Sequence, residues 1–243
     1  MDSMLASGVT PAGSRVDWIW RELVEMQAQA QISTHPYVVA LCRGELSRGG
    51  LQILATEYDH VAVAIALASH RLAACTDRDE DLQTLADAAA QDVERWRRFS
   101  FATGWGHADA WQYAEDPFPD TTACAAQLAG SARTCIEQLV GRVYMGRTLQ
   151  VDLARAVAAS LENRYRFSEL ALGWFTRHRF GDPSAEQHRQ AISRAADRNP
   201  FVALNSARET ARTIQRFYDS LYYNRLRTNT SLTTHSSSGG LTA

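Results

Sequence analysis

Hydrophobic residues recur with the 3.6-residue period of an amphipathic helix along most of the chain, and no alternating strand pattern runs for more than a few residues. Asp79 as a helix N-cap, Gly104 just past a helix end and Pro200 at a helix start punctuate this pattern. We therefore predict one all-α domain of seven to eight helices over residues 15–225. The predicted helices are 16–32, 35–45, 48–75, 80–103, about 121–140, 146–179, 183–197 and 200–225.

The two ends of the chain lack this period. Residues 1–14 are small and polar, with two glycines and a proline, and residues 226–243 form a low-complexity segment. Such compositions bury too little apolar surface to fold by themselves. Both ends are therefore predicted to be disordered tails.

Residues 104–120 form an irregular, aromatic segment inside the helical pattern. Trp105, Trp111, Tyr113 and Phe118 stand there among glycine and proline breakers. Aromatic loops in helical enzymes often cover the mouth of a pocket. The same rings would equally serve to anchor a long connection to the core, and the sequence favours neither interpretation.

The predicted helix 48–75 is apolar nearly all round, which is typical of a central helix. It nevertheless carries Glu57 and His60, which lie three residues apart and so share a face with the small residues Ala64 and Ala68. A carboxylate beside an imidazole can transfer protons or bind iron. The alternative is a buried histidine satisfied by Glu57 or by a helix carbonyl. Function is the slightly favoured interpretation.

Charge and composition exclude several classes of protein. The 243 residues carry 25 basic and 27 acidic groups, for a net charge of −2, which argues against a nucleic-acid-binding surface. Every basic residue is arginine, so lysine chemistry through a Schiff base is excluded. The N-terminus shows no signal-peptide pattern, and the longest apolar run, 61–69, is half the length of a membrane span. We predict a soluble cytoplasmic protein.

The four cysteines lack the spacing of a metal or redox motif and fall in apolar helical patterns. They are predicted to be small buried residues in a reducing compartment. The cysteines are Cys42, Cys75, Cys124 and Cys135.

Further acids and histidines form weaker candidates. Asp87 and Glu94 are seven residues apart on one helix face, for which a solvated face is the simpler interpretation. Glu162, Arg166 and Glu169 form a polar stripe on the predicted helix 146–179. This stripe either faces water or lines an interior polar cavity, and the cavity is the slightly favoured interpretation.

The segment 176–188 holds three residues that could ligate a metal. They are His178, Asp182 and His188. Asp182 precedes a proline and so also fits a helix N-cap, which is its favoured interpretation. Both histidines remain open as ligands.

The core of the chain resembles the heme-oxygenase-like superfamily over residues 15–225. The nearest members are pyrroloquinoline-quinone synthase, thiaminase II and the heme-oxygenase-like diiron oxidases. The resemblance implies an all-helical bundle that encloses a small-molecule pocket. It rests on four segments in order: HPYVVALCRGELSRGGLQILATEYDHV (35–61), QDVERWRRFSFATGW (91–105), ARAVAASLENRY (154–165) and RTIQRFYDSLYY (212–223).

Each relative implies different site residues. Glu57 and His60 take the place of an Asp and a Tyr that thiaminase II presents to its substrate. The nucleophilic cysteine of thiaminase II has no counterpart here, since Ser160 occupies that neighbourhood, so thiamine hydrolysis is not expected. The metal-free quinone synthase implies a pocket of His60, Tyr165, Arg166, Arg177 and His178, although the lysine of that family is missing. The diiron oxidases imply the ligand pool Asp87, Glu94, Glu162, His178, Asp182 and His188, with Ala185 where the last histidine would stand.

Together these patterns predict a dioxygen-using oxidoreductase for a small amino-acid-derived or aromatic metabolite of a biosynthetic pathway. Non-heme iron, a metal-free oxidase and a non-catalytic small-molecule-binding protein stay open as alternatives. A homodimer is expected, with no nucleic-acid or membrane partner. The predicted catalytic residues are Glu57, His60, Glu162 and His178, and the predicted substrate-binding residues are Tyr165, Arg166 and Arg177.

Overall fold

The computed structural model describes residues 12–76, 79–105, 116–179, 185–196 and 198–235. These residues form nine α-helices and no strand, which confirms the all-α prediction. In chain order the α-helices are α1 (Ala12–Gln29), α2 (Pro36–Cys42), α3 (Arg48–Ala74), α4 (Glu80–Ser100), α5 (Pro119–Ala129), α6 (Ile136–Asn163), α7 (Gly173–Arg179), α8 (Ala185–Ala196) and α9 (Pro200–His235). A 3₁₀ turn, η1 (Ile32–Thr34), precedes α2, and a π turn, η2 (Phe101–Trp105), ends α4.

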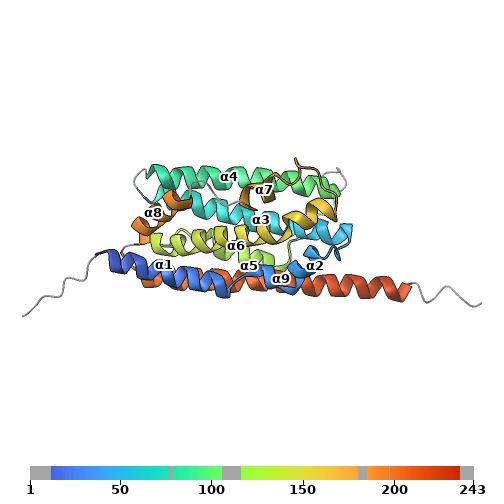
Figure 1. Cartoon of the computed structure of the whole chain (residues 1–243). Coiled ribbons are helices and arrows are strands. Elements are labelled where there is room, and N and C mark those ends of the chain that lie inside the picture. The colour runs from blue at the N-terminus through green and yellow to red at the C-terminus, as the bar shows by residue number, and fades with distance from the viewer. Residues whose placement is uncertain (1–11, 77–78, 106–115, 180–184, 197, 236–243) are drawn as a thin grey trace, which may run out of the picture.

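The helices lie in three approximate layers (Figure 1). α3 and α6 run through the middle, α4 and α7 lie along one side, and α1, α5 and α9 lie along the other. α9 is the longest helix and projects past the other helices at its C-terminal end. α3 and α6 therefore each touch both outer layers, and side chains that point between them lie at the centre of the bundle.

α3 is central because its sequence is apolar on almost every face. Ser47 caps its start, with the Ser47 hydroxyl accepting a hydrogen bond from the Gly50 N–H at 3.1 Å. By length and composition alone α3 could cross a membrane, but 61% of that window is buried inside the protein. This degree of burial fits a core helix. The run 61–69 lies within α3 and is by itself too short to span a membrane.

Three predicted helix boundaries are confirmed. The Asp79 carboxylate accepts hydrogen bonds from the N–H groups of Asp81 and Leu82, at 3.1 and 3.2 Å, and so caps α4. Pro200 begins α9. Gly104 has φ +98°, a conformation that favours glycine, where η2 ends.

The predicted break between residues 140 and 146 is wrong. α5 ends at Ala129 and is followed by Gly130, which has φ +71°, and α6 begins after Cys135 and continues through 141–145. Gly141 is needed there because α6 and α9 touch at their backbones. A Cβ on Gly141 would lie 2.2 Å from the Ala203 carbonyl oxygen.

The predicted single helix 146–179 is also wrong, because α6 ends at Asn163 and α7 begins only at Gly173. Arg166 adopts the left-handed conformation with φ +60°, and the Phe167 N–H donates back to the Leu161 carbonyl at 3.2 Å. This pattern closes a helix end, and glycine is its usual left-handed residue. Tyr165 and Phe167 still pack against the core, so the apolar period continues where the helix does not.

Other boundaries and burial states differ from expectation in smaller ways. α1 begins at Ala12, and α9 continues to His235, ten residues past the predicted domain end. Only Cys124 is buried as predicted for all four cysteines: Cys42 is half-buried, and Cys75 and Cys135 are exposed.

Candidate functional site

A buried ionic cluster joins α4, α6 and α7 at the centre of the bundle. We define the ionic cluster as Asp92 with the four side chains around it: Arg95, Arg147, Arg177 and His178. His178 Nε2 lies 3.1 Å from Asp92 Oδ2, with side chains that are 2% and 3% exposed. Arg95 Nη1 lies 3.0 Å from Oδ1, and Arg147 Nη1 and Arg177 Nε approach at 3.5 Å each.

The surroundings of Asp92 keep it ionised. Burial alone would raise the pKa of its carboxyl group, but contacts with His178, Arg147 and Arg177 outweigh burial and hold the pKa below the usual aspartate range. A negative charge is therefore fixed beside a buried imidazole. An imidazole beside a fixed carboxylate is a common arrangement for accepting and releasing a proton near neutral pH.

The position of Asp92 follows from the period of α4. Leu85, Ala89, Trp96 and Phe99 form the buried stripe of this helix, and Asp92 falls within that stripe. The helix therefore points one carboxylate at α6 and α7, while its acids Glu80, Asp87 and Glu94 are exposed.

Aromatic rings enclose the ionic cluster on its inner side. The Trp174 ring lies 4.7 Å from the His178 ring and 5.1 Å from the Trp96 ring, and Tyr58 lies 4.3 Å from Trp96, all between ring centroids. All four side chains are buried. Electrostatic interactions are stronger in such a dry environment than in water.

The structure separates Glu57 from His60. Glu57 is buried, and its Oε2 accepts a hydrogen bond from the Phe118 N–H at 3.1 Å. Phe118 stands at the N-terminus of α5 and has no side-chain cap of its own, so the carboxylate of Glu57 caps α5 from a neighbouring helix. His60 is exposed on the surface of α3. The two side chains do not form an acid and base pair.

The α6–α7 region brings only part of the predicted substrate set together. Arg177 belongs to the ionic cluster. The Tyr165 hydroxyl accepts a hydrogen bond from the Leu46 N–H at 3.1 Å and holds the start of α3 in place. Glu162, Arg166 and Glu169 are exposed, because the helix that was to form their stripe ends before Arg166. Ser160 is used structurally, donating to the Leu41 carbonyl at 3.1 Å.

The described members of the predicted iron site do not gather. Asp87 is exposed and accepts a hydrogen bond from Gln83, and Glu94 is exposed and pairs with Arg97. Within 12–76, 79–105, 116–179, 185–196 and 198–235, no three His, Cys, Asp or Glu side chains come together as metal ligands. Asp182 and the side chain of His188 lie outside the described residues. The described donors do not fit a diiron centre, and we derive no step through iron.

The aromatic segment before α5 is described only at its ends. Phe118 is half-buried and packs against the core next to the Glu57 contact, as an anchoring role predicts. Trp111, Tyr113 and the side chain of Trp105 lie outside the described residues.

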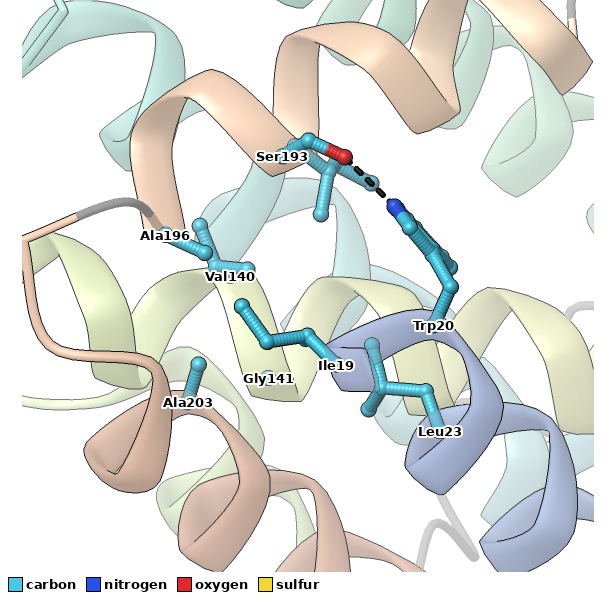
Figure 2. Close-up of a pocket in the computed structure, with 9 residues that line it drawn as sticks. Ile19, Trp20, Leu23, Val140, Gly141, Ser193, Ala196 and Ala203 are labelled. Carbon is cyan, nitrogen blue, oxygen red and sulfur yellow. Dashed lines mark hydrogen bonds between the residues drawn. The ribbon is translucent and has the colours of Figure 1, made fainter. Parts of the chain in front are cut away.

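A separate apolar pocket lies between α1, α6, α8 and α9 (Figure 2). Its space amounts to about 360 Å³, including volume open to solvent. Its polar contact is the hydrogen bond from Trp20 Nε1 to Ser193 Oγ at 2.6 Å, and no titratable side chain lines it. Chemistry is therefore better placed in the ionic cluster than in this pocket.

Comparison with known proteins identifies the fold. No protein-family model and no curated protein matches the chain. Among solved structures, the TenA homologue protein from P. horikoshii OT3 is 14% identical with a TM-score of 0.63, covering 85% of this chain and 97% of that one. A domain of unknown function with a heme oxygenase-like fold from Shewanella denitrificans OS217 is 12% identical with a TM-score of 0.62, covering 94% and 98%.

Heme oxygenase-1 from the cyanobacterium Synechocystis sp. PCC6803, in complex with heme, is 13% identical with a TM-score of 0.59, covering 91% of this chain and 98% of that one. The chain thus has the heme-oxygenase-like fold, as its resemblance predicted. At these identities the likeness concerns the fold alone, and the chemistry must be argued from the ionic cluster.

Proposed function

We propose that the chain is an enzyme that oxidises a small, acidic, electron-rich metabolite with dioxygen at the ionic cluster. The observation that carries this proposal is the contact of 3.1 Å between a buried carboxylate, Asp92, and a buried histidine, His178, against aromatic rings. Asp92 is a buried acid whose pKa is lowered by its cationic neighbours, and perturbed acids of this kind concentrate at functional sites. The enzymes of similar fold, TenA homologues and heme oxygenase, are compatible with catalysis at the bundle centre but do not specify the reaction.

Each member of the ionic cluster receives a role in this proposal. His178 takes a proton from the bound metabolite, and Asp92 stabilises the imidazolium that results. Arg177, which keeps 30% of its side chain exposed and approaches Asp92 at only 3.5 Å, binds the carboxylate of the metabolite, and Arg147 adds positive charge beside it. The deprotonated metabolite gives up two electrons and a second proton, and dioxygen becomes hydrogen peroxide.

Oxygen uptake by the purified full-length chain tests this function. The substrates are 3,4-dihydroxybenzoate and 2-amino-3-hydroxybenzoate, with protein-free solutions as the measure of autoxidation. We expect uptake by the wild-type protein, loss of at least 100-fold in His178→Asn, which removes a general base, and no change in Glu94→Gln, which alters an exposed acid. Uptake that is absent in the wild type, or unchanged in His178→Asn with an unchanged circular dichroism spectrum, contradicts the proposal.

One observation favours a second candidate, a non-catalytic binding protein. Asp92 contacts side chains from α4, α6 and α7, so the ionic cluster also fastens three helices to one another. In that case Asp92→Asn lowers the melting temperature, and no carboxylate-bearing compound is turned over. The oxygen assay separates the two candidates because only the enzyme consumes dioxygen.

A further inference from the structure

A second set of polar side chains lies one helical turn from the ionic cluster, on the same two helices. On α6, Gln150 follows Arg147 by three residues, and on α7, Trp174 precedes His178 by four. Residues at these spacings are neighbours on one helix face. Each helix therefore presents a charged group near Asp92 and a neutral polar group next to it.

Tyr58 of α3 joins Gln150 and Trp174. The Gln150 side chain lies close enough to the Tyr58 phenol to lower its pKa slightly against the larger effect of burial, and the Tyr58 and Trp174 rings lie 5.8 Å apart in an edge-to-face arrangement. The negative charge of Asp92 also contributes to raising the pKa of this phenol. We call Tyr58, Gln150 and Trp174 the inner polar set.

Two atoms of the inner polar set are unsatisfied. Gln150 Oε1 and Trp174 Nε1 are buried and have no hydrogen-bond partner among the described residues. Gln150 is 3% exposed and Trp174 is 0% exposed. Folded proteins rarely bury such atoms without a partner, because leaving them unpaired is costly. One of these atoms is an acceptor and the other a donor, so a single ligand group with both functions can satisfy them.

The surroundings of the inner polar set favour an uncharged ligand group. Trp96, Trp174 and Phe217 pack around Tyr58. Burial raises the pKa of the Tyr58 phenol well above its usual range, so the phenol stays neutral near neutral pH. A charged group would lose its hydration here and gain no opposite charge from these three side chains.

We propose that the inner polar set determines specificity by binding a neutral hydroxyl, amide or ring N–H group of the metabolite whose carboxylate lies at the ionic cluster. Gln150 Oε1 accepts a hydrogen bond from this group, and Trp174 Nε1 donates one to it. The inference rests on the proposed position of the carboxylate. It narrows the substrate class to flat acids that carry a neutral hydrogen-bonding group on the side opposite the carboxylate.

Binding of two simple probes, benzoate and 4-hydroxybenzoate, tests this inference by calorimetry on the full-length chain. We expect the wild type to bind 4-hydroxybenzoate about tenfold more tightly than benzoate, which is the scale of one hydrogen bond to a buried group. Gln150→Met, which keeps the length of the side chain, should bring the ratio to about one, because 4-hydroxybenzoate then loses the acceptor of its hydrogen bond. The control variant Gln83→Met, which removes an exposed amide from α4, should leave the ratio at its wild-type value.

Equal binding of both probes by the wild type, or an undiminished ratio in Gln150→Met, overturns the inference. If Gln150→Met does not fold, binding of 4-methoxybenzoate to the wild type is the second test. This probe cannot donate a hydrogen bond to Gln150 and should bind no better than benzoate. Benzoate binding itself reports on the ionic cluster: it should weaken at least tenfold in Arg177→Gln. An unchanged benzoate Kd in Arg177→Gln contradicts the proposed position of the carboxylate. Equal binding of the two probes by the wild type, together with weakened benzoate binding in Arg177→Gln, contradicts only the inner polar set.

Discussion

The start and the middle of α4 use the same chemical groups to different effect. At its start, Asp79 pairs with Arg194 of α8 at 2.9 Å, with side chains that are 20% and 53% exposed. In the middle of the helix, Asp92 pairs with arginines and with the buried His178. Water screens the first pair and is excluded from the contact with His178, so an ionic contact is cheap to lose at the start of α4 and costly in its middle. The difference between Asp79 and Asp92 lies in their exposure to water more than in the number of their contacts.

The largest effect is expected for Asp92→Ala. This change removes the carboxylate that lies 3.1 Å from the buried imidazole of His178 and weakens the charge balance around it. We expect the free energy of unfolding to fall by about 3–5 kcal/mol, the usual cost of breaking a buried pair. Urea denaturation followed by circular dichroism measures it. A loss below about 1 kcal/mol would mean that the ionic cluster is as well hydrated as the surface pair.

Acid should remove part of the same contribution. The pKa of Asp92 in the folded protein is lowered by its cationic neighbours, which outweigh the opposing effect of burial. The stabilisation is therefore complete above the unfolded pKa of about 3.9 and is lost as the pH falls through the lower folded pKa. Denaturation midpoints measured between pH 5 and pH 2 should fall more steeply in the wild type than in Asp92→Asn. Parallel curves for the two proteins would contradict this account.

Asp79→Ala should have a smaller effect. Asp79 caps α4 through two backbone N–H groups and also pairs with Arg194, and the loss of a helix cap costs about 1 kcal/mol. Urea denaturation under the conditions used for Asp92→Ala gives the direct comparison. If the two substitutions lower the free energy of unfolding equally, the distinction between the exposed pair at the start of α4 and the buried cluster in its middle does not hold.

Arg194→Gln should have the smallest effect. Arg194 is mostly exposed and contacts Asp79 and Asp81 at 2.9 and 3.0 Å. We expect a loss below about 1 kcal/mol that disappears in 1 M salt, because salt screens surface pairs. A loss that persists in high salt would show that Arg194 acts through packing of α8 and not through its charge.

The helical period was sufficient to find most of the fold. Asp79, Gly104 and Pro200 marked real boundaries because the backbone preference or capping side chain of each residue favours a helix end. The break at 164–172 could not be found in this way, since Tyr165 and Phe167 keep contact with the core outside any helix and an arginine occupies the left-handed position. A glycine at position 166 would have signalled the break.

The candidate site was only half visible in the sequence. His178 and Arg177 were named as candidates, but Asp92 was overlooked among the many charged residues of α4. The signal was its place in the buried stripe between Ala89 and Trp96. Glu57 was placed in the interior for a sound reason, yet its partner is a backbone N–H from a distant segment, which periodicity cannot reveal.

The short length of α7 gives the centre of the bundle a particular dynamic property. A helix of seven residues has too few internal hydrogen bonds to persist alone, so α7 is folded only while it is packed. It carries Trp174, Arg177 and His178 together, and therefore their backbone amides should exchange with deuterium as one cooperative unit. The ionic cluster and the inner polar set would then be lost and regained in the same opening event. Hydrogen exchange in α7 would thus report on the integrity of the whole centre, even before any substrate is known.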